Sequence, residues 1–319
     1  MRAFVLSGGG SLGSSQAGAL RALLEQDIRP DIIVGCSAGS LNASYFAREI
    51  SLENVERLTD IWRAVTTRDV YPGRKLKALW RLLSGKDSLF DNRRFYTFLQ
   101  QHDISPDDTF EDIAQEVRLY ITATRLRSRS LHVFGDNPDD RVLDALMAST
   151  ALTPMHPPWI VDGERYVDGG AVTPLPLRVA LERGADEIFA LHIMEDLEMR
   201  SPDQIVRGVA GVLSRTLSTM FQLQTQHDLL LAEMAKKVVV HDIELRIGNP
   251  PEPTDFSQSE RLIELGYAQT QAYLAALPSR GRKQRQHRRT IWRRPGGIFR
   301  RGWMSKESTL APQPVAGSE

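Results

Sequence analysis

The chain has 319 residues, 41% of them hydrophobic and 25% charged, and its 40 basic side chains balance its 40 acidic ones. This composition suits a folded domain with a full core and excludes a wholly disordered chain. It also excludes a membrane-spanning helix, because no apolar run approaches the roughly 18–20 residues required. Ala3–Leu6 is too short for the core of a signal peptide, and Cys36, the single cysteine, is typical of a reducing compartment. We therefore expect a cytoplasmic protein.

The first fifty residues alternate between strand and helix patterns, which predicts parallel strands joined by right-handed crossovers. We expect a strand, a helix, a strand and a helix, in that order, at Ala3–Leu6, Ser14–Gln26, Asp31–Val34 and Ala38–Ile50. Later strand patterns lie at Val117–Thr124, Leu131–Phe134, Glu187–Ile193 and Lys237–Ile243. Helix patterns lie at Leu52–Ala64, Asn92–Gln101, Leu143–Ser149, Leu175–Arg183, Pro202–Ala235 and Ser257–Leu277. The last helix opens with Ser257-x-x-Glu260, a capping-box signature.

The charge is unevenly distributed along the chain. Eleven basic residues and no acidic one lie between Arg280 and Lys306, which leaves 29 basic against 38 acidic residues before them. Pro278 ends the regular pattern, so we expect a mostly disordered basic tail over 278–319. The sequence thus predicts one α/β domain, with a core over 3–183 that continues through 184–277, followed by this tail.

A Gly-x-Ser-x-Gly pentapeptide joins the second predicted strand to the second predicted helix. This is the sequence form of a nucleophile elbow, a turn so tight that the positions two before and two after the serine require glycine. Ser37 is therefore the candidate nucleophile, with Gly35 and Gly39 as the flanking glycines, and Cys36 is expected to be a small apolar filler under the turn. Chance also produces this pentapeptide in about one chain in ten of this length, so Ser37 needs partners elsewhere.

A glycine-rich loop, Gly8-Gly9-Gly10-Ser11-Leu12-Gly13, separates the first strand from the first helix. Gly8-x-Gly10-x-x-Gly13 matches the dinucleotide-binding fingerprint, but that site requires an acid at the end of the second strand, and Asp31 lies at its beginning. The favoured interpretation is an oxyanion hole, in which loop N–H groups beside a helix N-terminus hold a developing negative charge. The candidate donors are Gly8, Gly9, Gly10, Ser11 and Gly13.

The chain offers no obvious histidine to act as the base of a serine triad. Its histidines lie in predicted strands, in the tail or in unremarkable positions: His102, His132, His156, His192, His227, His241 and His287. Asp168 instead follows a strand pattern and enters a glycine turn with Gly169 and Gly170. Alone, such an aspartate is ordinarily a turn former. Beside the elbow and the glycine loop, it becomes the candidate proton acceptor of a Ser–Asp dyad.

The order of these three motifs resembles that of the patatin-like lipolytic acyl hydrolases. Ala148–Pro158 is similar to a further family segment that precedes the Asp-Gly motif, and Ser88–Asp91 looks like another family stretch. The resemblance implies a three-layer α/β/α sandwich around a mainly parallel sheet, with Ser37 as nucleophile, Asp168 as proton acceptor and the glycine loop as oxyanion hole. Two departures are Leu12, where many members carry Arg or Lys, and Thr153 in place of the usual proline.

The resemblance further implies a serine acyl hydrolase acting on lipid esters, a lipid esterase similar to phospholipase A. The alternative is a catalytically silent lipid- or protein-binding module of the same fold. We expect neither a metal nor an organic cofactor.

Two segments combine basic and aromatic residues and predict peripheral contact with the inner membrane surface, Lys75–Leu83 and the tail over 280–306. Their alternatives are a helix packed on the core and a solubilising tail. Nucleic acid is not the expected partner.

Overall fold

The structure, a computed structural model, describes residues 1–73, 78, 80–81, 83–196, 208–235 and 238–277. The predicted tail, most of the basic Lys75–Leu83 segment and the predicted start of the helix at Pro202 lie outside the described residues.

Within them, one eight-stranded sheet organises the molecule. Its parallel part has the order β3-β2-β1-β7-β8. These strands span Arg118–Arg125, Ile32–Cys36, Arg2–Leu6, Glu187–Asp196 and Val239–Gly248. The antiparallel strands β4, β5 and β6 span Ser130–Phe134, Trp159–Val161 and Glu164–Asp168.

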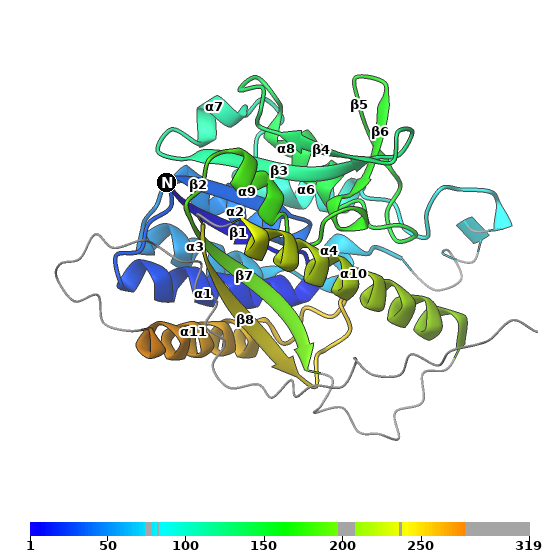
Figure 1. The fold of residues 1–319 in the computed structure, drawn as a ribbon. Coiled ribbons are helices and arrows are strands. Elements are labelled where there is room, and N and C mark those ends of the chain that lie inside the picture. Colours follow the sequence, from blue (N-terminus) through cyan, green and yellow to red (C-terminus); the bar gives the residue numbers. More distant parts are fainter. Residues whose placement is uncertain (74–77, 79, 82, 197–207, 236–237, 278–319) are drawn as a thin grey trace, which may run out of the picture.

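Helices cover both faces of this sheet, as Figure 1 shows. Along β1, Phe4 and Leu6 join the core beneath one helical layer, whereas Ala3 and Val5 join the core beneath the other, because successive side chains of a strand point to opposite faces. The first layer contains α1, α2, α3, α6, α8 and α11, which span Ser14–Glu25, Ala38–Arg48, Leu52–Ala64, Arg93–Gln101, Val142–Ser149 and Ser259–Ala276. The second contains α9, Leu177–Glu182, and α10, Gly208–Met234. The predicted α/β/α sandwich around a mainly parallel sheet is confirmed.

The pairing along β3 brings two strand ends together. Thr124 pairs with both β4 and β6, so these two strands lie on opposite edges of β3, and Thr122 pairs with both β2 and β4. It follows that β2 and β6 share one edge of β3 and meet there end to end. Thr122 faces Cys36, the last residue of β2, and the next residue, Ala123, faces Asp168, the last residue of β6.

Some boundaries differ from the sequence prediction. The strand β2 extends through Cys36, directly to Ser37, and the short strand β5 was not predicted. The short helices α4, Thr67–Val70, and α7, Phe110–Ile113, were not predicted either, because each is a single turn without a periodic pattern.

The predicted capping box of the last helix is wrong. The helix α11 begins at Ser259, and the Ser257 N–H donates to the Asp255 carboxylate at 2.9 Å. The Glu260 carboxylate instead pairs with Arg63 of α3, Oε2 to Nε at 2.5 Å. A guanidinium in another element thus replaces the local backbone partner that the sequence pattern predicted for Glu260.

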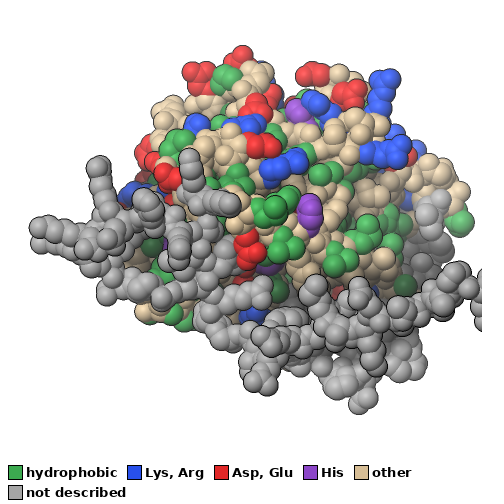
Figure 2. Space-filling view, viewed as in Figure 1, with side chains coloured by type: hydrophobic (Ala, Val, Ile, Leu, Met, Phe, Trp, Pro, Cys, Tyr) green, Lys and Arg blue, Asp and Glu red, His purple; other side chains and the backbone are tan. Residues whose placement is uncertain are grey.

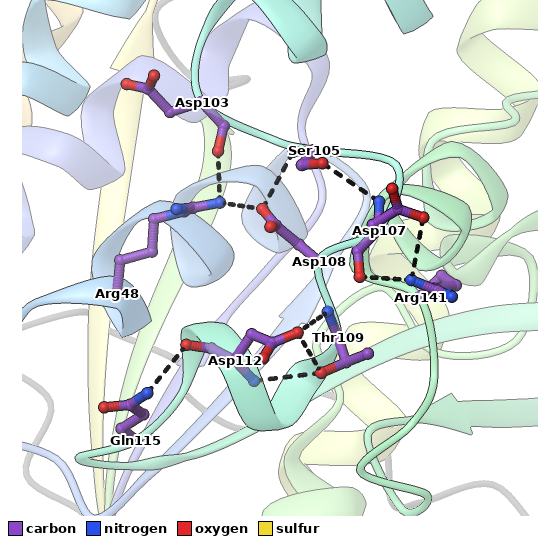
Figure 3. Close-up of polar contacts among 9 residues, drawn as sticks. All are labelled: Arg48, Asp103, Ser105, Asp107, Asp108, Thr109, Asp112, Gln115 and Arg141. Carbon is purple, nitrogen blue, oxygen red and sulfur yellow. Dashed lines mark hydrogen bonds and ion pairs between the residues drawn. The ribbon is translucent and has the colours of Figure 1, made fainter.

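A polar cluster holds the C-terminal end of α2, far from its first residue (Figure 3). Arg48 donates to the Asp108 carboxylate at 2.6 Å and to the carbonyl of Asp103. Nearby, Thr109 and Asp112 form the capping box of α7. These contacts tie α2 to the segment before β3 and fix the helix whose N-terminus forms the site described next.

Candidate active site

Ser37 lies in a strained turn between β2 and α2. Its backbone has φ 52° and ψ −124°, a conformation that a residue with a side chain rarely adopts. Steric crowding explains why both flanking positions are glycine. A Cβ on Gly39 would lie 2.4 Å from the carbonyl oxygen of Leu6, and one on Gly35 would lie 2.6 Å from that of Gly39. The turn therefore raises the half-buried serine hydroxyl at the carboxyl edge of the sheet, beside the N-terminus of α2.

The Ser37 hydroxyl donates to Asp168, with 2.6 Å between Oγ and Oδ2. The other carboxylate oxygen accepts the Gly170 N–H at 2.7 Å. The side chain is buried, and desolvation raises the pKa of Asp168 from its usual 3.8 to about 6, against the opposing effect of these two hydrogen bonds. A carboxylate with a raised pKa thus accepts the hydrogen bond of the candidate nucleophile.

Contacts from β3 and from the segment after α8 fix the backbone of Asp168. Its N–H donates to the Ala151 carbonyl at 3.1 Å, and its carbonyl accepts the Thr124 hydroxyl at 3.0 Å. A Cβ on Gly169 would lie 2.5 Å from the Thr122 carbonyl oxygen, so the turn after Asp168 requires glycine there.

The glycine loop lies directly against Ser37. A Cβ on Gly8 would lie 3.1 Å from the Ser37 Cβ and 3.8 Å from its Oγ. The Gly8 N–H, however, donates to the Pro174 carbonyl at 3.0 Å, and the Ser11 N–H donates to the Pro253 carbonyl at 2.9 Å. Carbonyl groups of the protein therefore already occupy two of the predicted donors.

The N–H groups of Gly9 and Gly10 form no hydrogen bond to another described residue. Both glycines are partly exposed, unlike Ser11 and Gly13, which are buried in the short 3-10 helix that follows. Gly10 has φ +58°, a conformation that favours glycine. In the loop that contacts Ser37 through Gly8, these two adjacent N–H groups thus have no hydrogen-bond partner among the described residues.

A buried chain of polar side chains holds the loop at both ends. Gln16 donates to the Ser7 carbonyl at 2.9 Å, and Asn42 donates to the Gly13 carbonyl at 2.9 Å and to the Gln16 Oε1 at 2.8 Å. The Trp62 indole N–H donates to the Asn42 Oδ1 at 2.7 Å. Sequence reasoning missed all three side chains. The signal available in the sequence was an amide residue in each of two helices, Gln16 in α1 after the glycine loop and Asn42 in α2 after the elbow.

A further residue that sequence reasoning did not assign is Ser149, at the end of α8. Its buried hydroxyl accepts the Ser37 N–H at 2.9 Å, so it holds the strained turn from outside. Ser40 holds the same turn from within α2, where its hydroxyl donates to the Ser37 carbonyl at 2.6 Å. Ser149 belongs to the Ala148–Pro158 segment, which supported the family resemblance without a stated role.

The described histidines do not provide a base for Ser37. His156 is buried, its Nε2–H donates to the Val70 carbonyl at 2.8 Å, and burial lowers its pKa. His192 faces the Asp242 carboxylate across β7 and β8, with 3.3 Å between Nδ1 and Oδ1. Cys36 is fully buried beneath the turn, as expected, and burial raises the pKa of its thiol well above the usual value.

The structure offers no support for a dinucleotide or metal site in the described part of the chain. Asp31, at the start of β2, accepts the Arg2 N–H at 2.6 Å, at the edge of the sheet opposite to the glycine loop. No group of three or more His, Cys, Asp or Glu side chains in the described ranges is arranged to hold a metal ion.

The profile of a known family, described as patatin-like phospholipase, matches residues 4–181, more than half of the chain. The chain belongs to the patatin-like phospholipase family. It is 30% identical over 192 residues to patatin-like phospholipase domain-containing protein 7 of Rattus norvegicus, a match that covers 60% of this chain and 13% of that protein. Lysophospholipase NTE1 of Saccharomyces cerevisiae is 27% identical over 202 residues, which cover 59% of this chain and 10% of that protein. The chain thus matches only a small part of these longer relatives.

Solved structures of bacterial proteins give weaker matches. VipD from Legionella pneumophila is 15% identical with a TM-score of 0.48, over 86% of this chain and 67% of VipD. ExoU from Pseudomonas aeruginosa, solved with SpcU, is 21% identical with a TM-score of 0.42, over 86% of this chain and 51% of that chain.

The described helices include none that is both long and apolar enough to cross a bilayer. In the predicted membrane-contact segment, Trp80 is 61% exposed and Leu83 is 78% exposed, so neither packs on the core.

Proposed function

We propose that this patatin-like chain hydrolyses carboxylic esters of lipids by acyl transfer through Ser37. The observation that carries the proposal is the 2.6 Å hydrogen bond from the Ser37 hydroxyl to the Asp168 carboxylate. Membership of the phospholipase family and the similarity to a lysophospholipase support a lipid ester, and a phospholipid with one or two acyl chains is the proposed substrate class.

In the first step, Ser37 Oγ attacks the ester carbonyl carbon while its proton passes to Asp168 Oδ2. The carbonyl oxygen becomes an oxyanion, which the unpaired N–H groups of Gly9 and Gly10 stabilise. Collapse of this intermediate breaks the bond to the leaving alcohol, and the proton on Asp168 passes to the alcohol oxygen. The acyl group remains on Ser37.

In the second step, a water molecule attacks the acyl carbon, and Asp168 accepts its proton. The same two N–H groups stabilise the second oxyanion. The bond between Oγ and the acyl carbon then breaks, the proton on Asp168 returns to Ser37, and a carboxylic acid leaves. One carboxylate therefore acts alternately as base and acid, a role that suits a pKa of about 6.

Labelling with a fluorophosphonate, which reacts with activated serines, tests the nucleophile. Wild type is expected to be labelled and Ser37→Ala is expected to be unreactive. Ser44→Ala is the matched control, because Ser44 is a buried serine of α2, the helix that follows Ser37, and its hydroxyl donates to the Ser40 carbonyl. Equal labelling of wild type and Ser37→Ala contradicts the assignment.

A panel of short soluble esters, lysophospholipids, phospholipids and triacylglycerols tests the substrate class. Release of fatty acid from phospholipid or lysophospholipid, lost in Ser37→Ala, is the expected result. A folded wild type that binds lipid without hydrolysing any ester favours instead a catalytically silent module of the same fold.

A further inference from the structure

The helix α10 has two apolar faces, and the described part of the protein covers only one of them. On the covered face, Thr225, Leu229 and Ala232 are buried, the last two in the core beneath α9 and α10. On the other face, seven large apolar side chains are between 39% and 74% exposed: Val212, Leu213, Met220, Leu223, Leu230, Leu231 and Met234. A helix that is apolar on both sides is ordinarily covered on both sides.

The exposed side chains form one continuous stripe, called the α10 stripe below. At about 100° per residue, all seven fall within an arc of about 100°, opposite the buried face, and they extend over about 33 Å of helix. The charged residues Arg215, Asp228 and Glu233 fall outside this arc, and Thr216 and His227 are its polar members among the described side chains. Figure 2 shows hydrophobic side chains gathered over α10 on this face of the molecule.

The same helix contacts the turn that carries the candidate base. The Phe221 ring lies 3.8 Å from a Cβ placed on Gly170, and the Gln224 amide donates to the Ala171 carbonyl at 3.1 Å. One turn further along, the Asp228 carboxylate accepts the Thr173 hydroxyl at 2.6 Å. Whatever docks on the α10 stripe is therefore held beside the segment that follows Asp168.

We propose that the α10 stripe is a lipid-docking surface that lays α10 on the face of a bilayer, with Ser37 and Asp168 beside it. This inference deepens the proposed lipid hydrolysis and rests on it for the choice of occupant. Leu, Val and Met make up the stripe, without Tyr, Trp or Arg, the residues that anchor specific protein interfaces. A broad, uncharged aliphatic face instead suits the non-directional burial that a lipid surface offers.

Co-sedimentation of the full chain with electroneutral phosphatidylcholine vesicles tests the proposal. These vesicles carry no net charge for the basic residues beyond Pro278 to bind, so the assay reports apolar contact. Binding is measured in a Ser37→Ala background, where no hydrolysis alters the vesicles. The test variant is Leu223→Gln with Leu230→Gln. The control is Leu52→Gln with Leu126→Gln, two exposed leucines outside α10.

The test variant is expected to bind vesicles at least about tenfold more weakly than its parent, and the control is expected to bind equally well. With Ser37 restored, the test variant is expected to hydrolyse a soluble short-chain ester normally and vesicle lipid more slowly. A second stripe variant, Leu213→Gln with Met234→Gln, repeats the measurement if the first unfolds.

Unchanged vesicle binding by either folded stripe variant overturns the proposal. So does a wild-type dimer that these substitutions convert to a monomer, because the stripe is then a contact between two copies of the chain. If the stripe variants lose vesicle binding and the wild type hydrolyses no ester, the proposed function is refuted, whereas the docking surface is retained.

Discussion

The Asp168→Asn variant is expected to lose ester hydrolysis and, at pH 8, to be more stable than wild type. Asparagine has the same shape and keeps both contacts, since its amide donates to Ser37 Oγ and its carbonyl accepts the Gly170 N–H. What it removes is a buried negative charge and the ability to accept a proton. The first change stabilises the fold, and the second abolishes catalysis.

The size of the gain follows from the pKa of Asp168. Burial raises this pKa from 3.8 to about 6. Each pKa unit corresponds to about 1.4 kcal/mol, so the charged carboxylate lowers the free energy of unfolding by about 3 kcal/mol at pH 8. Well below pH 3.8 the carboxyl is protonated in both the folded and the unfolded state, and this cost vanishes. The advantage of the variant should therefore be constant above about pH 6 and shrink as the pH falls from 6 to 4.

Urea unfolding, followed by tryptophan fluorescence at several pH values, measures this difference. The control is Asp139→Asn, a substitution at an exposed aspartate, which should leave the unfolding free energy nearly unchanged. Equal stability of wild type and Asp168→Asn at pH 8, or an advantage that grows on acidification, refutes the reasoning that Asp168 is a desolvated base.

Three further outcomes are expected. With a soluble ester, kcat/KM should rise with pH through a midpoint of about 6 and fall about tenfold per pH unit below it; a flat profile between pH 4.5 and 8 rules Asp168 out as the base. Ser149→Ala leaves the Ser37 N–H without its acceptor, so kcat should fall while KM changes little, and urea unfolding should show a free energy of unfolding lower by about 1–3 kcal/mol. A variant with the kcat of wild type shows that the elbow does not need the Ser149 hydroxyl. Asn42→Leu removes the hydrogen bonds to Gly13, Gln16 and Trp62, so the free energy of unfolding should fall by at least about 2 kcal/mol in the same urea measurement, and kcat should fall as well. A variant that is as active and as stable as wild type shows that the glycine loop does not depend on these side chains.

Local stereochemistry explains why much of the site was predictable. The elbow around Ser37 is a turn of five consecutive residues in which a side chain at Gly35 or Gly39 would clash with nearby backbone, so the sequence shows it as a local pattern. The alternation of strand and helix patterns in the first fifty residues likewise follows from apolar periodicity. Both patterns can be read from residues that lie close together in the chain.

Other predictions failed, or were incomplete, where a distant segment competes for a polar group. Glu260 binds Arg63 of another helix instead of capping its own, which no local pattern shows. Among the candidate oxyanion donors, the N–H groups of Gly8 and Ser11 are occupied by the carbonyls of Pro174 and Pro253, far along the chain. Only the folded structure shows which donors remain unpaired.

The sequence by itself determined the strained serine, the glycine loop and the order of the α/β elements, because each depends on residues close together in the chain. The tertiary structure decided the partnership of Ser37 with Asp168, 131 residues away, through the shared edge of β3. It also decided the elevated pKa of that carboxylate and the apolar face of α10 that the described residues leave exposed. Burial and long-range hydrogen bonding depend on which segments pack together, and no local pattern encodes them.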